Sequence, residues 1–104
     1  DSIERESFTH ARADMLRHRV TDLIVNSKLD LKWIGERFER HKGALESVYR
    51  DELAAKIARL NGIVEHASAD WSSVDAGAFA KAKEELDLAS VRLQEISIAE
   101  SLRS

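Results

Sequence analysis

A stripe of mostly apolar residues runs along the first 45 positions at steps of three and four, the spacing of one face of an α-helix. The stripe consists of Leu16, Val20, Leu23, Ser27, Leu31, Ile34, Phe38, His41 and Leu45. Asp1 and Glu4 have the spacing of a capping box at the start of this pattern. Gly43 is the expected stop, because glycine adopts the left-handed backbone that closes many helices. The pattern predicts one long helix that ends at Gly43.

A second helical stripe begins soon after Gly43, and Ser47 is a favoured N-cap residue for it. Its members are Tyr49, Leu53, Ile57, Leu60, Val64 and Ala67. The dipeptide Asn61-Gly62 is a strong turn signal, but the apolar phase continues across it unchanged. We therefore predict that this second helix is uninterrupted.

The periodicity breaks over residues 69–73, which we predict to be a loop. Ser73 or Asp75 then caps a third helix. The stripe of that helix is Phe79, Ala82, Leu86, Ala89, Leu93 and Ile96. Because the connections between the three helices are short, neighbouring helices are expected to run antiparallel.

The expected lengths of the helices differ. A first helix of about 40 residues spans about 60 Å, whereas helices of about 20 to 28 residues reach about 30 to 42 Å. The predicted fold is all-α, with a long N-terminal helix overhanging an antiparallel three-helix bundle. Residues 1–20 form the overhanging segment and residues 21–104 the bundle. The predicted bundle core is Leu23, Ile34, Phe38, Leu53, Ile57, Leu60, Phe79, Leu86 and Leu93.

The overhanging segment carries apolar residues that have no helix of this chain to pack against, among them Phe8, Met15 and Leu16. A second apolar line on the long helix lies roughly opposite the bundle face and includes Phe8, Met15, Leu29 and Trp33. Apolar surface of this kind typically marks a contact with another molecule or domain. We expect the segment to bind another domain or a second copy of the chain.

Composition narrows the functional classes. The 104 residues include no proline and no cysteine. The absence of cysteine excludes disulfide scaffolds, cysteine-based zinc fingers and thiol nucleophiles. A net charge of −3 argues against a nucleic-acid partner. No apolar run is long enough to cross a membrane. The first residue is Asp1 and not methionine, which we interpret as the start of a processed or excised segment.

The sharpest candidate for chemistry is a metal site at Glu6, His10, Asp14 and His18, which are spaced four apart on one helical face. In a chain that is 34% charged, charged residues often occur four apart and form ordinary i,i+4 polar pairs. We favour this interpretation over a metal site. No serine lies in a glycine-flanked elbow, and no glycine pair has phosphate-loop spacing. The sequence therefore predicts no catalytic, cofactor-binding or metal-binding residue.

Two blocks of sequence carry a family resemblance. Residues 7–15, SFTHARADM, resemble the start of the helical lid in Hsp70-type chaperones, especially bacterial members. The carboxy-terminal block resembles the last bundle helix of that lid through an acidic cap and an LD…AS…L pattern. The matching residues are Asp75, Phe79, Ala82, Leu86, Asp87, Ala89, Ser90, Leu93 and Ile98. The connection after Gly43 is shorter than usual for the family, and the acidic tetrapeptide that ends eukaryotic cytosolic members is absent.

The resemblance implies a function. In that family a nucleotide-binding domain hydrolyses ATP, a β-sandwich binds an extended hydrophobic peptide, and the helical lid closes over it. This chain would be the lid alone, cytoplasmic, without a cofactor of its own. The resemblance implies that Phe8, Ala11, Met15 and Leu16 contact the β-sandwich of the same parent chain or lie at the bend where the lid hinges. Asp30 lies near the position where some members carry an aspartate that latches the lid to the sandwich.

A second hypothesis remains open from the residues alone. The chain would then be a free-standing helical adaptor that forms a homodimer through the overhanging helix, with no nucleic-acid or membrane partner. The gene sequence upstream of Asp1 separates the two, because the lid hypothesis requires an ATPase domain and a β-rich domain there.

Overall fold

The computed structural model describes the backbone of residues 2–103 and the side chains of residues 13–103. The described residues are helical throughout, with short connections and no strand. The helices are α1 (Ser2–His41), α2 (Ser47–Ala69), α3 (Ala76–Ala89) and α4 (Val91–Arg103), with single 3-10 turns at Lys42–Ala44 and Trp71–Ser73. The prediction of an all-α chain is confirmed.

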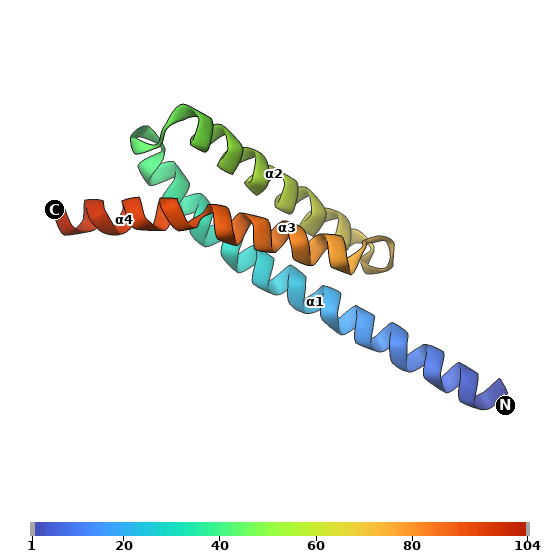
Figure 1. Cartoon of the computed structure of the whole chain (residues 1–104). Helices are drawn as coiled ribbons and strands as arrows, with labels where there is room; N and C mark the ends of the chain where they lie inside the picture. Colours follow the sequence, from blue (N-terminus) through green and yellow to red (C-terminus); the bar gives the residue numbers. More distant parts are fainter. Residues whose placement is uncertain (1, 104) are drawn as a thin grey trace.

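The helices form an elongated molecule of 66 × 23 × 18 Å. α2 runs back beside the carboxy-terminal part of α1, and α3 returns beside α2 (Figure 1). α4 continues in the direction of α3 and packs against the last turns of α1. The amino-terminal end of α1 lies apart from the other helices in Figure 1. A helix of 40 residues is about 60 Å long, so α1 accounts for the long dimension.

The core lies between α1, α2, α3 and α4. Six of the nine predicted core residues are buried: Ile34, Leu53, Leu60, Phe79, Leu86 and Leu93. The other three, Leu23, Phe38 and Ile57, are half-buried and pack against the buried cluster. The periodicity thus identifies the inward face of each helix.

Two polar side chains occupy core positions of α1. Val20, Ser27, Ile34 and His41 follow one another at intervals of seven residues, and all four are buried. Such a repeat keeps one line of a helix against its neighbours. The Nδ1 atom of His41 pairs with the carboxylate of Glu100 on α4. This pair joins the last turn of α1 to α4.

The corner between α1 and α2 differs from prediction in two details. The prediction of a left-handed backbone at Gly43 is wrong, because none of the described residues, glycines included, has a positive φ. α1 ends at His41, and the 3-10 turn that follows pairs the Leu45 N–H with the Lys42 carbonyl. Ser47 is the first residue of α2 and not its cap. Glu46 occupies the N-cap in an extended conformation, and its carbonyl accepts the Arg50 N–H.

The connection between α2 and α3 follows the prediction closely. α2 continues through Asn61 and Gly62 and ends at Ala69, so the predicted uninterrupted helix is confirmed. The Asp70 carboxylate accepts the Ser72 N–H within the 3-10 turn. Of the two candidate caps for the next helix, Asp75 is the one used, because its carboxylate accepts the N–H groups of Gly77 and Ala78.

The third helix is predicted to be continuous, and this prediction is wrong. The segment forms two helices, α3 and α4, with a break at Ser90. In a regular helix the Leu93 N–H would donate to the Ala89 carbonyl. Here the hydroxyl of Tyr49 on α2 lies between them. It donates to the Ala89 carbonyl and accepts the Leu93 N–H at 3.2 Å. A side chain inserted into the backbone ladder is an established cause of helix breaks.

We expect Tyr49→Phe to join α3 and α4 into one helix, because the Leu93 N–H is then free to donate to the Ala89 carbonyl. The free energy of unfolding should fall by about 1 kcal/mol, since one backbone hydrogen bond replaces the two hydrogen bonds of the Tyr49 hydroxyl. NMR chemical shifts of residues 89–93 measure the change. Shifts that keep the signature of a break at Ser90 in the variant would show that Tyr49 does not cause it.

Candidate interaction surfaces

The contact segment implied by the resemblance lies on the amino-terminal part of α1. The side chains of Phe8 and Ala11 lie outside the described residues. Met15 is 72% exposed and Leu16 is 39% exposed, and the first buried residue of the described part of α1 is Val20. Two adjacent apolar side chains thus face solvent before the helix enters the bundle.

Polar residues surround this pair. Asp14, Arg17, His18 and Thr21 line a shallow hollow of about 470 Å³ on the same stretch of α1. Two members of the predicted metal quartet, Asp14 and His18, lie here, while the side chains of Glu6 and His10 fall outside the described residues. Among the side chains that are described, no group of three or more His, Asp or Glu residues is arranged to hold a metal ion.

The second apolar line continues along the exposed side of α1. Val25, Leu29 and Trp33 are all exposed, and the guanidinium of Arg37 lies over the ring of Trp33. Trp33 reaches a hollow between α1 and α4, where Ile98 and Leu102 are also exposed. The exposed apolar surface therefore extends from α1 to α4.

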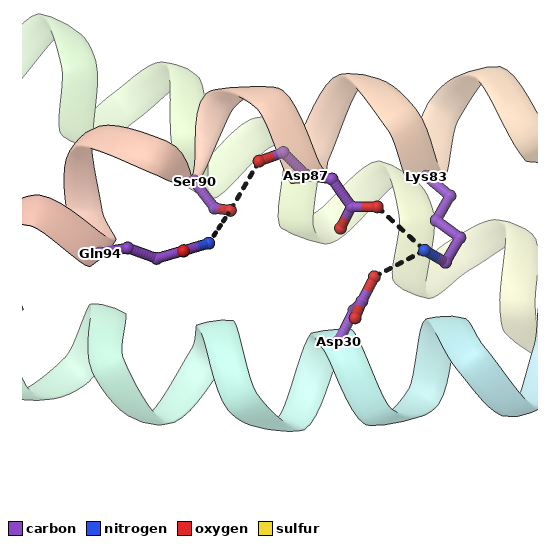
Figure 2. A network of polar contacts seen from close by, with 5 residues as sticks. All are labelled: Asp30, Lys83, Asp87, Ser90 and Gln94. Carbon is purple, nitrogen blue, oxygen red and sulfur yellow. Dashed lines mark hydrogen bonds and ion pairs between the residues drawn. The ribbon is translucent and has the colours of Figure 1, made fainter.

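Asp30 faces α3 within the bundle (Figure 2). Its carboxylate lies 2.8 Å from the Nζ atom of Lys83, which is also 2.9 Å from the carboxylate of Asp87. One ammonium group therefore bridges two carboxylates across the α1–α3 interface. The Asp30 carboxylate, which the resemblance implicates in a latch to another domain, is paired within its own chain. A latch would have to compete with Lys83.

The polar network extends to α4. The Ser90 hydroxyl donates to the Asp87 carbonyl and accepts a hydrogen bond from the Gln94 side-chain amide (Figure 2). The sequence did not predict that Lys83, Asp87 and Gln94 take part in a polar network. The spacing of Lys83 and Asp87, four apart on one helix, was a signal for their pairing. Their contact with Asp30 depends on how α1 and α3 pack and had no signal in the sequence.

The two carboxylates of the network titrate differently. Burial raises the pKa of Asp30, but hydrogen bonding with Asp87 and the Lys83 ammonium outweigh burial, and the net pKa lies below its ordinary value. Burial and the neighbouring Asp30 carboxylate hold the pKa of Asp87 above its ordinary value, despite Lys83.

Burial lowers the pKa of the Lys83 ammonium, but hydrogen bonds with Asp30 and Asp87 and their charges outweigh it, so its pKa is raised. The folded chain thus holds this proton more tightly than the unfolded chain. The contribution to stability is fully present below pH of about 10.4, the ordinary pKa of lysine, and is lost as the pH rises through the folded pKa.

We expect Lys83→Met to lower the free energy of unfolding at pH 7 by about 1–2 kcal/mol, because two facing carboxylates lose their counter-ion. The difference from the wild type should shrink as the pH rises above about 10.4. Urea unfolding at pH 7, 9 and 11, followed by circular dichroism, measures it. Lys81→Met, at an exposed lysine of the same helix, is the control and should cost little at each pH. A Lys83→Met deficit that is the same at all three pH values would contradict the assignment.

None of the helices described here is both long and apolar enough to span a bilayer. No protein-family model matches the chain, and no similar protein was found among curated proteins or solved structures.

Proposed function

We propose that the chain is the helical lid of an Hsp70-type chaperone, acting in the cytoplasm. In this proposal, residues 1–20 overhang the three-helix bundle of residues 21–104 and pack against a peptide-binding β-sandwich of the same parent protein. The lid slows the escape of a bound hydrophobic peptide by covering it. This fragment performs no catalysis, and ATP binds to the nucleotide-binding domain of the parent.

The exposure of Met15 is the observation that carries the proposal. Met15 is 72% exposed on a part of α1 that precedes Val20, the first buried position among the described side chains. Methionine and leucine on a helix surface are suited to adaptable apolar contacts, because their side chains repack readily. A partner that covers Met15 and Leu16 would explain why both apolar side chains precede the bundle.

The rest of the fold supports a role as a rigid cover. α1 passes from the proposed contact segment into the bundle without a break, so movement of the segment carries the bundle with it. The Asp30–Lys83–Asp87 contacts fix α1 against α3, and the His41–Glu100 pair fixes it against α4. A contact made at Met15 would therefore orient the whole bundle.

Removing residues 1–104 from the parent protein tests the proposal. We expect a fluorescent peptide bound to the β-sandwich to dissociate faster from the truncated protein than from the intact one. A cover over the bound peptide changes its residence time and not its rate of encounter with the site. An unchanged release rate would contradict the proposal. Sedimentation of a Phe8→Glu, Met15→Glu double variant tests the alternative, a dimeric adaptor, which predicts a dimer that the double variant dissociates.

A further inference from the structure

A hollow lies between α1 and α4 at the end of the molecule opposite to Met15. It has a volume of about 350 Å³. The residues that line it include Trp33 and Arg37 of α1 with Gln94, Ser97, Ile98 and Leu102 of α4. We call it the α1–α4 groove. Trp33 is 18 residues from Met15, a separation of about 27 Å along a helix, so the groove is distinct from the proposed lid contact.

The groove has apolar walls that face solvent. Trp33 is 47% exposed, Ile98 is 61% exposed and Leu102 is 83% exposed. These side chains come from two helices and converge on one hollow, unlike single apolar residues scattered over a surface. Convergent exposed apolar side chains mark sites that receive an apolar group of a partner.

The polar rim of the groove is basic although the whole chain is acidic. An adjoining hollow is lined by Trp33, Arg37 and Arg40 together with Glu36, so arginine outnumbers carboxylate there. The net charge of the chain is −3, so a local excess of arginine is not a consequence of overall composition. A local positive field selects negatively charged partners and speeds their association.

The stacking of Arg37 over the Trp33 ring favours a carboxylate as the partner group. The contact holds the flat guanidinium beside the apolar wall, where its N–H groups can donate two parallel hydrogen bonds to a carboxylate. A carboxylate and an apolar side chain that are close together in one partner would therefore meet Arg37 and the Trp33–Ile98 wall at the same time. Short peptides that alternate acidic and leucine residues have this chemistry.

We propose that the α1–α4 groove binds a short acidic peptide segment, with an apolar side chain between Trp33 and Ile98 and carboxylates on Arg37 and Arg40. This site is independent of the lid proposal, since it uses neither the amino-terminal part of α1 nor a parent domain. It gives the chain a second partner surface, of a different chemistry from the contact at Met15.

Fluorescence anisotropy with labelled peptides tests the site on the full 104-residue chain. The probe is the hexapeptide Glu-Glu-Leu-Leu-Glu-Glu, compared with Lys-Lys-Leu-Leu-Lys-Lys and Glu-Glu-Gly-Gly-Glu-Glu. We expect the first to bind, and each comparison peptide to bind at least about tenfold more weakly, because each lacks one of the two features. Raising the salt concentration from about 0.05 to about 0.5 M should weaken binding of the first peptide.

Variants of the chain locate the binding. Arg37→Glu with Arg40→Glu should weaken binding of the acidic probe by at least about tenfold, and Ile98→Ser should weaken it without changing the charge of the groove. Arg17→Glu with Arg19→Glu makes the same change of charge at exposed positions elsewhere on α1 and should leave the dissociation constant within about twofold. Circular dichroism establishes that each variant is folded.

Any one of four outcomes would overturn the proposal. The first is equal affinity of the chain for the acidic and the basic leucine peptides, and the second is absence of binding by the acidic probe. The third is an equal loss of affinity in both double-arginine variants, which would indicate a general effect of charge. Sedimentation equilibrium of the wild type and of Ile98→Ser tests whether a second copy of the chain occupies the groove. Self-association that Ile98→Ser abolishes would assign the groove to a dimer and contradict a peptide site.

Discussion

Replacing Phe79 with alanine should lower the free energy of unfolding by about 3–5 kcal/mol. Phe79 lies on α3 with no exposed surface and belongs to the buried cluster that α1, α2 and α3 share. Its ring is the largest of the fully buried side chains among the described residues. Truncation removes the apolar contacts of the ring and leaves a cavity that close-packed helices refill only in part.

The loss is large compared with the total stability of a small domain, about 5–15 kcal/mol. Urea unfolding followed by circular dichroism measures it, and the midpoint should move well below that of the wild type. Leu102→Ala is the matched control, because this apolar side chain on α4 is exposed, and its free energy of unfolding should change by no more than about 0.5 kcal/mol. Equal losses in the two variants would show that Phe79 is not at the centre of the core.

If the chain is the lid proposed above, the second large effect is expected at Met15 in the parent protein. We expect Met15→Glu to raise the release rate of bound peptide by about tenfold or more, because burial of a methionine side chain contributes about 1.5–3 kcal/mol. A carboxylate in its place would also lose water without gaining a partner. Val48→Glu is the control, since it introduces the same charge at an exposed apolar position of α2 outside the proposed contact.

Much of the fold is determined by local sequence. The inward faces of the three predicted helices follow from apolar spacing alone, which is why Leu53, Leu60 and Leu86 were identified as core residues and are fully buried. The Asp75 cap follows from the preference of carboxylates for the first backbone N–H groups of a helix. The Asn61-Gly62 dipeptide lies within α2, as predicted, because packing of the stripe outweighs its local preference for a turn.

The features that the sequence did not reveal depend on contacts between helices. The hydroxyl that bridges the break at Ser90 belongs to Tyr49, a residue 41 positions away on α2, so no pattern within residues 76–103 predicts this contact. The pairing of Lys83 with Asp30 likewise requires α1 and α3 to be in register. The α1–α4 groove combines Trp33 with Ile98, which are on separate stretches of sequence. Local periodicity identifies buried faces, whereas polar partners and surface hollows arise from the assembly of those faces.

The most direct test of the lid proposal is the rate at which a fluorescent peptide leaves the intact parent protein in its closed state. The rate should be measured for the wild type, Met15→Glu and Val48→Glu at one peptide concentration, by stopped-flow displacement with excess unlabelled peptide. The proposal predicts faster release from Met15→Glu and a wild-type rate from Val48→Glu. Equal rates for all three proteins, or equal acceleration in both variants, would contradict the claim that the amino-terminal part of α1 holds the lid in place.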